Sequence, residues 1–442
     1  MGESPRIDRV SADDLMSLVA ERGSTPLQVG AVLTLDARSG LDPVRAIDVL
    51  ARRITAVPRL RQRLVDVPFG CGRPAWGDDA AFAITNHVTS VRCPEPGGEQ
   101  AALGLAAGMI VEPLQRDRPL WTATLVTDTA PGEAALIIVF HHVLADGIGG
   151  LAVLASLVDG AAEPRFTAFP RPGPSVRQLA VDAAGGRIRS LRRLPAALRR
   201  IGSAVAELRP AGRVRAVRTS LTRPTGPRRS FASIRVDLEQ LRTVAHARHA
   251  TVNDAVMSAI GGALHRLLEL RGERADEFVF SVPFSARRQA SAGDLGNQSG
   301  VIPLAIPGIG DPAERLEEVA AVTRAAKRAA PGASTAVLGP LFRLLARVGL
   351  YQRFINRQRL IHTFVTNLRG PETRQTIFGC PITGIIPLTV ASGDVTVSFA
   401  VLSYAGTLAV TINADPDACP DLPELRQALA DELGALAAPF AV

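Results

Sequence analysis

Short apolar runs alternate along this chain with longer stretches in which apolar residues recur every three or four positions. The first pattern is typical of buried strands and the second of amphipathic helices. Strands are predicted at 29–35, 121–126, 134–140, 233–236, 278–282, 301–306 and 361–366, with a hairpin formed by 396–403 and 407–413. Helices are predicted from a capped start at Ser11, at 41–56, after residue 147, at 238–246, after residue 251 and at 341–358. This alternation in both halves predicts a mixed α/β architecture without a solenoid repeat.

A change in composition separates the two halves. The chain has 442 residues, 47% of them hydrophobic, which is too long for one ordinary compact core and sufficient for two. Between about Glu163 and Arg228 prolines cluster first and arginines then recur. We therefore expect an N-terminal domain over 1–163, a basic crossover over 164–228 and a C-terminal domain over 229–442.

The crossover carries an apolar stripe from Leu191 to Leu208, with a start or kink predicted at Pro195. A basic amphipathic helix of this kind can lie on anionic lipid. A linker helix docked on a domain, with its arginines in solvent, has the same stripe, and we prefer this simpler interpretation. Contact with a membrane or a lipid inclusion stays open at this point.

Charge and composition restrict the class of protein. The net charge of +8 comes almost wholly from arginine, since Lys327 is the only lysine, and only 4% of residues are aromatic. Nucleic-acid binding is therefore not expected, because arginines interleaved with stacking aromatics are missing. No apolar run reaches the roughly 18–20 residues that span a bilayer, and the start lacks the apolar segment of a signal peptide, so we expect a cytoplasmic protein. The four cysteines have no CxxC spacing and are expected to be reduced and buried.

The candidate chemistry lies in residues 141–147, which read H-H-V-L-A-D-G. A predicted strand leads into the two histidines and a predicted helix follows Gly147, so the pair is expected at a rigid junction that faces a cleft. Transfer of an acyl group to a hydroxyl needs a neutral imidazole that takes the hydroxyl proton, and His142 is the candidate for this base. Adjacent residues at the end of a strand point to opposite sides, and the pattern itself does not say which histidine faces the cleft. Asp146 could bond the second ring nitrogen or brace the loop through an arginine, and Gly147 permits close backbone approach.

Two other interpretations of the histidines remain. Both could be buried and hydrogen-bonded without a chemical role, although a chance match to this pattern is expected on the order of once in a thousand such chains. A metal site is the second alternative, but no third ligand cluster accompanies the motif, and His246 and His249 have no acidic or thiol partners nearby. We expect no metal, and we expect His87, His265 and His362 to be structural.

Six short segments in the same order resemble the bacterial wax ester synthase/acyl-CoA:diacylglycerol acyltransferases, which belong to a superfamily with an HHxxxDG motif. Besides the histidine motif, the resemblance rests on Pro119-Leu120-Trp121, Asn253-Asp254, Pro283 to Arg287 with Gly296-Asn297, Thr366 to Pro371, and Ser403 to Gly406 with Asp415. It runs from about Val10 to Leu436.

The resemblance implies two chloramphenicol-acetyltransferase-like mixed-sheet domains with the active site at their interface, and a tunnel that the thioester and the acceptor enter from opposite faces. It implies His142 as the base, with His141 and Asp146 as structural members of the motif. Arg287 would pair with Asp146. Asn253 could donate to the developing oxyanion or orient the acceptor, but Asn253 and Asp254 also fit a capped helix start after Thr251. Support for the substrate or the fold is expected from Asp254, Arg287, Asn297 and Trp121.

The family pattern implies acyl-CoA as the donor and diacylglycerol or a long-chain alcohol as the acceptor, with no cofactor. We expect direct attack without an acyl-enzyme, because no serine or cysteine lies in a nucleophile elbow. The alternatives are a related acyltransferase acting on a specialised metabolite and an inactive lipid-binding protein. Gln28, Thr366 and the pair Leu368-Arg369 depart from the family pattern. None of them falls within the histidine motif, so we expect them to affect substrate identity rather than reaction type.

Overall fold

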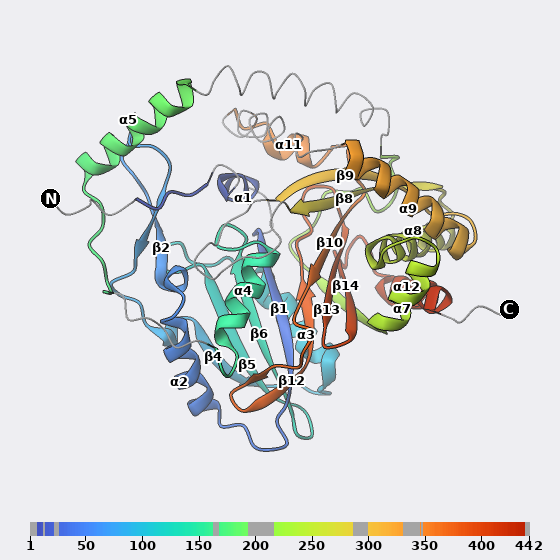
Figure 1. The fold of residues 1–442 in the computed structure, drawn as a ribbon, viewed down its shortest axis with the longest axis horizontal. Coiled ribbons are helices and arrows are strands. Elements are labelled where there is room, and N and C mark those ends of the chain that lie inside the picture. Colours follow the sequence, from blue (N-terminus) through green and yellow to red (C-terminus); the bar gives the residue numbers. More distant parts are fainter. Residues whose placement is uncertain are drawn as a thin grey trace.

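The computed structural model describes residues 7–11, 14–21, 26–161, 168–192, 216–285, 299–329, 345 and 348–437. Two six-stranded sheets lie side by side, one formed mainly by each half of the chain (Figure 1). The expected mixed α/β fold with two sheet-rich parts is confirmed. Within the described ranges, no helix is long and apolar enough to cross a membrane.

The first sheet belongs mainly to the N-terminal half. In spatial order its strands are β11 (Thr376–Ile377), β12 (Cys380–Leu388), β1 (Gln28–Asp36), β6 (Glu133–His141), β5 (Trp121–Ala130) and β4 (Val88–Arg92). Helix α3 (Gly98–Val111) packs on one face, and α2 (Pro43–Ile54) and α4 (Gly147–Leu157) pack on the other. A small hairpin of β2 (Gln62–Val65) and β3 (Ala75–Asp78), with α1 (Asp14–Ala20) and α5 (Val176–Arg192), completes this half.

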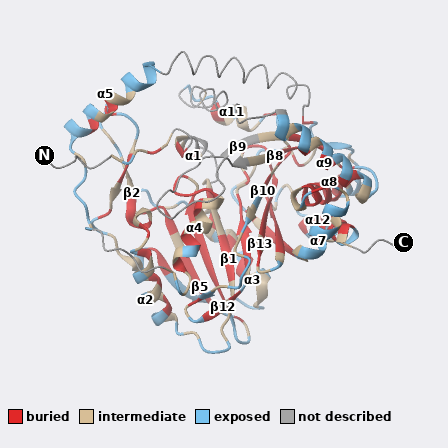
Figure 2. Ribbon diagram, in the orientation of Figure 1, coloured by how far each residue is buried: buried red, intermediate tan, exposed pale blue. Residues whose placement is uncertain are grey.

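Strand β6 delivers the histidine pair to the interior of the molecule. Every residue from Ala134 to His141 is buried. Even-numbered residues from 134 to 140 pack in the cluster that contains α2 and α4, and odd-numbered residues from 135 to 139 pack in the cluster that contains α3. Because helices cover both faces, the strand is a continuous apolar run rather than an alternating one. Figure 2 shows the resulting buried interior of this sheet.

The second sheet belongs to the C-terminal half. In spatial order its strands are β7 (Ser230–Asp237), β14 (Thr407–Ala414), β13 (Val397–Tyr404), β10 (Thr363–Arg369), β8 (Glu277–Ser285) and β9 (Ser299–Pro307). One face is covered by α7 (Leu238–Ala247), α8 (Val252–Leu270), α9 (Pro312–Ala329) and α12 (Leu422–Ala437), on the right in Figure 1. The short helix α11 (Tyr351–Ile355) precedes β10.

The second sheet opens between two neighbouring strands. β8 and β10 pair only where Phe280 and Ser281 lie beside Thr363 and Phe364. Beyond this point β8 stays paired with β9 and β10 stays paired with β13. Pro283 follows on β8 and has no N–H to donate to a neighbour. The carboxyl ends of β8 and β10 are therefore separate, and the sheet has a gap at this position.

The C-terminal half contributes two strands, β11 and β12, to the first sheet. β12 lies at residues 380–388, yet it pairs with β1 from Gly30 opposite Leu388 to Leu35 opposite Ile382. The hydroxyl of Tyr404, at the end of β13, accepts a hydrogen bond from the Gln375 N–H (2.8 Å) and donates one to the Ile382 carbonyl (3.1 Å). The sheets therefore do not divide where a simple cut of the sequence would divide them.

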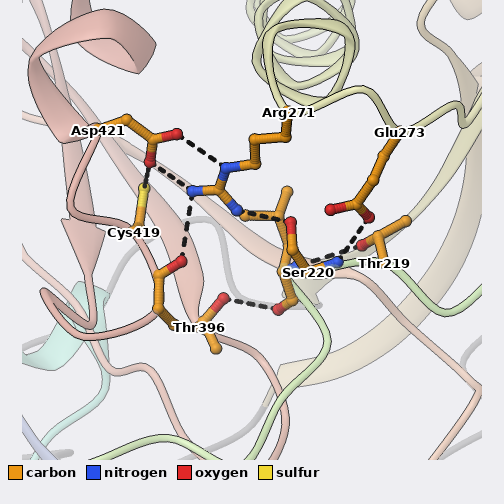
Figure 3. Close-up of polar contacts among 9 residues, drawn as sticks. Thr219, Ser220, Arg271, Glu273, Thr396, Cys419 and Asp421 are labelled. Atoms are coloured by element: carbon orange, nitrogen blue, oxygen red, sulfur yellow. Dashed lines mark hydrogen bonds and ion pairs between the residues drawn. The ribbon is translucent and has the colours of Figure 1, made fainter.

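A polar network holds the last part of the predicted crossover. Arg271, at the end of α8, donates to the Asp421 carboxylate (2.8 Å) and to the Ser220 hydroxyl (2.6 Å). The Thr396 hydroxyl donates to the Leu221 carbonyl at 2.6 Å (Figure 3). These contacts fasten residues 219–222 to three elements of the C-terminal half.

The predicted strands and helices that fall within the described residues are confirmed, with one exception. Ser11 caps α1, since its hydroxyl accepts from the Asp14 N–H at 2.9 Å. The predicted helix at 341–358 is confirmed only in part of its described residues. Residue 345 and α11 are helical, whereas Gly349, with a positive φ of 73°, lies in a turn before α11, and the residues after Ile355 are not helical. Most of the predicted stripe from Leu191 to Leu208 lies outside the described residues, since α5 is described only as far as Arg192.

Candidate active site

The backbone of the histidine pair is fixed on both sides. His141 is the last residue of β6, and its N–H donates to the Leu120 carbonyl at 3.0 Å. The His142 N–H donates to the Leu27 carbonyl at 2.9 Å. Leu120 belongs to the Pro119-Leu120-Trp121 element, so this element supports the motif through its main chain. The two neighbouring segments leave the histidines little freedom to move.

His141 is buried, with 2% of its surface exposed, and both ring nitrogens face defined groups. The Val143 N–H donates to Nδ1 at 3.0 Å, so Nδ1 must be without a proton and the neutral ring carries its proton on Nε2. Nε2 lies 3.1 Å from Oε1 of Glu21, which also contacts Arg116. Burial raises the pKa of Glu21, but the contacts with His141 and Arg116 outweigh it and hold the pKa below its ordinary value.

His142 follows directly after β6 and is intermediate in exposure. Burial lowers its pKa below the ordinary histidine value, whereas a backbone contact and the charge of Asp146 act in the opposite direction. The net decrease keeps the imidazole neutral at neutral pH. A neutral ring at this position can accept a proton, which is the property that a general base requires.

Asp146 and Gly147 begin α4. The Asp146 carboxylate accepts from the Gly149 N–H at 2.8 Å and thereby caps the helix. Gly147 lies against the other half of the molecule, because a Cβ at this position would be 2.8 Å from the side chain of Leu368 on β10. The motif therefore forms a contact between the two sheets.

Two departures from the family pattern lie outside the histidine motif in sequence but next to it in space. Leu368 packs against Gly147. Gln28 lies opposite His141 in the β1–β6 ladder, and its amide bonds the carbonyls of Ile110 and Glu112 at 2.8 and 2.9 Å. Both residues border the histidine motif, although they are far from it in sequence. Substitutions there can change the shape of the site directly.

Asn253 and Asp254 begin α8 and differ in their surroundings. Asp254 is buried and forms a capping box with Thr251, and it also accepts from the Thr323 hydroxyl at 2.7 Å. Asn253 accepts from the Asn367 side chain at 3.1 Å. Asn253 and Asn367 both line a cavity of about 320 Å³. Asp254 thus joins two helices, whereas Asn253 faces a space that could hold part of a substrate.

This cavity lies beside the histidine motif across one strand. Side chains alternate along β10, so Leu368 faces Gly147 whereas Asn367 and Arg369 face the cavity. A larger cavity of about 610 Å³ lies beyond the other end of α4, near Asp159. No residue of 141–147 lines either cavity, but the smaller one adjoins the motif through Leu368, which contacts Gly147. The smaller cavity is therefore the one next to the candidate chemistry.

Trp121 is buried in the packing behind the motif. Its indole N–H donates to the Leu60 carbonyl at 2.8 Å, and its ring stacks on His87 with centroids 4.6 Å apart. The His87 Nδ1 is 2.9 Å from the Trp121 carbonyl, and burial lowers the pKa of His87. These contacts agree with a packing role for both residues.

Several expected groups do not enter this geometry. Arg287 and Asn297 lie outside the described residues. The four cysteines are free and buried, and burial raises the pKa of Cys419 to about 12. A thiol of this kind is a weak nucleophile at neutral pH. In the described part of the chain, no group of three or more His, Cys, Asp and Glu residues could hold a metal ion.

One contact of the site was not predicted from the sequence. Glu21 faces His141 across 120 positions of chain and carries no motif of its own. Its only local sign is its place just after the predicted first helix, and this did not distinguish it from a solvated acid. The pairing depends on where α1 packs, which the local sequence does not specify.

Comparison with known proteins assigns the family. Residues 10–256 match the wax ester synthase/diacylglycerol acyltransferase catalytic domain, and residues 295–437 match the WS/DGAT C-terminal domain. A Mycobacterium tuberculosis protein described as a probable diacylglycerol O-acyltransferase is 27% identical over 429 residues, which cover 93% of this chain and 91% of the relative.

Solved structures share the fold at lower identity. The wax ester synthase/diacylglycerol acyltransferase of Marinobacter aquaeolei has a TM-score of 0.72 at 20% identity, covering 97% of this chain and 98% of the other. The first condensation domain of the calcium-dependent antibiotic synthetase has a TM-score of 0.62 at 20% identity, covering 99% and 98%. The catalytic-domain match alone extends over residues 10–256, more than half of the chain. The chain therefore belongs to the wax ester synthase/diacylglycerol acyltransferase family.

Proposed function

We propose that this protein transfers a fatty acyl group from acyl-CoA to the hydroxyl of diacylglycerol or a long-chain alcohol, giving triacylglycerol or a wax ester. Family membership supports the reaction class. The observation that carries the proposal is the state of His142, whose pKa is lowered by burial so that its imidazole is neutral, within a motif whose Gly147 contacts the other sheet. The relatives' descriptions as diacylglycerol O-acyltransferases favour a glycerolipid acceptor.

In the proposed reaction the thioester and the alcohol bind together. His142 takes the hydroxyl proton while the oxygen attacks the thioester carbonyl. The tetrahedral intermediate collapses to the ester, and the imidazolium returns its proton to the departing thiolate. The proton is conserved and no covalent enzyme intermediate forms.

We assign supporting roles to the other motif residues. His141 and Glu21 hold the turn in which His142 lies, and Asp146 holds the start of α4. Asn253 lines the cavity, and we assign it a donor role toward the oxyanion through its Nδ2, since its Oδ1 accepts from Asn367. Arg287 is proposed as a partner of Asp146, as the family pattern implies. The division into 1–163, 164–228 and 229–442 stays a prediction.

We propose that the protein works at the surface of a membrane or lipid inclusion, where its acceptor would dissolve. The support comes from α5, which exposes Val181, Ile188 and Leu191 and ends in a segment that contains Arg189 and Arg192. Apolar side chains next to cations are typical of helices that bind anionic interfaces. Flotation with vesicles that contain anionic lipid tests this placement.

The test of the proposed function is a panel of acyl-CoAs crossed with diacylglycerol and alcohols. Free thiol and lipid ester are measured together, with His142→Ala as the matched control. Equal amounts of thiol and ester that both depend on His142 are expected. Thiol without ester would indicate hydrolysis, and neither product would indicate an inactive lipid-binding protein.

A further inference from the structure

Two cations line the cavity beside the histidine motif. The cavity is bounded by ten residues, and Lys327 and Arg369 are the charged ones among them. Both are exposed, so they lie at its mouth rather than its floor. The remaining lining residues are apolar or neutral: Asn253, Val282, Pro283, Ile302, Leu304, Thr323, Ala326 and Asn367.

The position of Lys327 is fixed by a buried contact. Thr323, Ala326 and Lys327 lie on one face of α9, three or four residues apart. Thr323 donates to the buried Asp254 carboxylate, which also belongs to the capping box of α8. This contact holds α9 against α8 and directs the Lys327 side of the helix toward the cavity.

Neither cation is neutralised by the groups that the structure describes. The ion pairs found there use other arginines, such as Arg315 with Glu432 and Arg248 with Glu317. Lys327 and Arg369 are both exposed and both line the same cavity. Two such cations form a site that suits an anion with more than one charge.

The cavity also lies next to the strand that contacts the histidine motif. It lies where β8 and β10 part, since Val282 and Pro283 line one side and Asn367 and Arg369 line the other. Leu368, between the latter two, contacts Gly147 of the motif. A slender ligand in this gap would therefore have one end at the two cations and the other near the candidate base.

We infer that Lys327 and Arg369 bind the phosphate groups of the acyl-CoA donor, and that the uncharged gap between β8 and β10 takes the pantetheine arm. This rests on the proposed function. In coenzyme A the phosphates and the thioester sulfur lie at opposite ends of the pantetheine arm. Phosphates at Lys327 and Arg369 would therefore place the thioester toward His142. A volume of about 320 Å³ is at the lower end for ligand pockets and suits an arm rather than the whole molecule.

The single lysine makes a direct test available. Lys327 is the only lysine in the 442-residue chain, so an amine-acetylating reagent modifies it and the N-terminus alone. Modification of each is measured by mass spectrometry on the full-length protein. Coenzyme A and pantetheine are compared, each at a concentration that saturates its binding. We expect coenzyme A to slow modification of Lys327 at least fivefold while the N-terminus is unaffected, and pantetheine to leave Lys327 reactive. Equal protection by both, or protection by neither, would overturn the inference.

Variants give an independent test. Lys327→Gln and Arg369→Gln should each raise the KM for acyl-CoA about tenfold, with little change in kcat. A tenfold change is at the lower end of the effect expected when a charge-assisted hydrogen bond is lost. The KM for an acyl-pantetheine thioester, which has no phosphate at this end, should stay unchanged. Arg328→Gln is the matched control, because Arg328 is exposed on α9 and does not line the cavity. An equal rise in KM with both donors, or the same rise in the control, would contradict phosphate binding.

The two proposals fail in different ways. If no thioester is consumed but coenzyme A still protects Lys327, the phosphate site stands and the proposed reaction falls. If acyl-CoA is consumed normally while Lys327 stays unprotected and the variants keep their KM, the reaction stands and the phosphate site falls.

Discussion

The two histidines of the motif are adjacent in sequence and have different surroundings. His141 has its ring between the Val143 N–H and Glu21, in a buried position. His142 is the more exposed of the pair, and its pKa is lowered chiefly by burial. This difference supports the assignment of the base to His142 and of a structural role to His141.

The first prediction separates these roles. His142→Ala should keep its fold and lose about 10² to 10⁴-fold in turnover, the usual contribution of a general base. His141→Ala should instead lower the unfolding midpoint and reduce activity indirectly. Thermal unfolding and thiol release, at saturating acceptor, are the measurements. Near-normal turnover in His142→Ala with a folded, inactive His141→Ala would reverse the assignment.

The second prediction concerns pH. A histidine has an ordinary pKa of about 6.5. Because the folded pKa of His142 is lower, the ring stays neutral as pH falls through 6.5, so the acid limb of kcat/KM should lie below that value. The unfolded ring takes a proton in the same interval, so this group's contribution to stability decreases as pH falls below about 6.5. An acid limb at or above 6.5 would argue against His142 as the base.

The third prediction tests Glu21. Glu21→Ala removes the carboxylate that lies 3.1 Å from the buried Nε2 of His141 and should cost about 1–3 kcal/mol of stability, because the buried ring nitrogen loses the charged group that faces it. Glu21→Gln keeps an acceptor oxygen and should cost less. Urea unfolding measures both, and the imidazole nitrogen shifts in NMR report the His141 tautomer. If Glu21→Ala and Glu21→Gln had the same free energy of unfolding, the contact with His141 would not stabilise the fold.

At the scale of elements, the strands that could be predicted were the apolar runs. β6 was identifiable because helices cover both of its faces, which makes Ala134 to Phe140 apolar throughout. β12 was not predicted, because Pro381, Gly384 and Pro387 interrupt its pattern and its partner β1 is some 350 residues away in sequence. Local patterns describe single elements, whereas pairing at this distance depends on the whole fold.

The candidate site shows the same limit. The histidine motif was predicted because its residues are consecutive. The contacts that surround it, from Gln28, Glu21 and Leu368, come from separate elements and have no common spacing. Their proximity follows from the packing of α1, β1 and β10 around the end of β6, which no single segment specifies.

The fourth prediction concerns the start of α4. Asp146→Ala removes the cap at Gly149 and should destabilise the protein by about 1 kcal/mol, whereas Asp146→Asn keeps a capping oxygen and should be nearly neutral. If Arg287 pairs with Asp146, both variants should lose more than the cap alone explains. Denaturant unfolding of the two variants, together with Arg287→Ala, distinguishes the contributions. Wild-type stability with lost activity in Asp146→Ala would indicate a direct chemical role.

At the scale of the whole molecule, strand β12 joins the two sheets, because it comes from the C-terminal half and pairs with β1 in the first sheet. Tyr404 on β13 holds this strand in place, because its hydroxyl accepts from the Gln375 N–H and donates to the Ile382 carbonyl. Tyr404→Phe should lower the free energy of unfolding by about 1–2 kcal/mol, since two backbone groups lose their partner. Unfolding should stay a single transition if the halves fold together. Two separate transitions in the wild-type protein would contradict that coupling.

The position of β12 also determines what happens when the chain is cut. A fragment ending at residue 192 would contain β1 without β12, and so would present a long apolar strand with an open hydrogen-bonding edge. Such an edge readily pairs with other copies, so we expect this fragment to aggregate when it is produced alone. Produced together with residues 216–442, the same fragment should recover its missing strand from the second piece and remain in solution. The two pieces would then complement each other as halves of one interlocked protein.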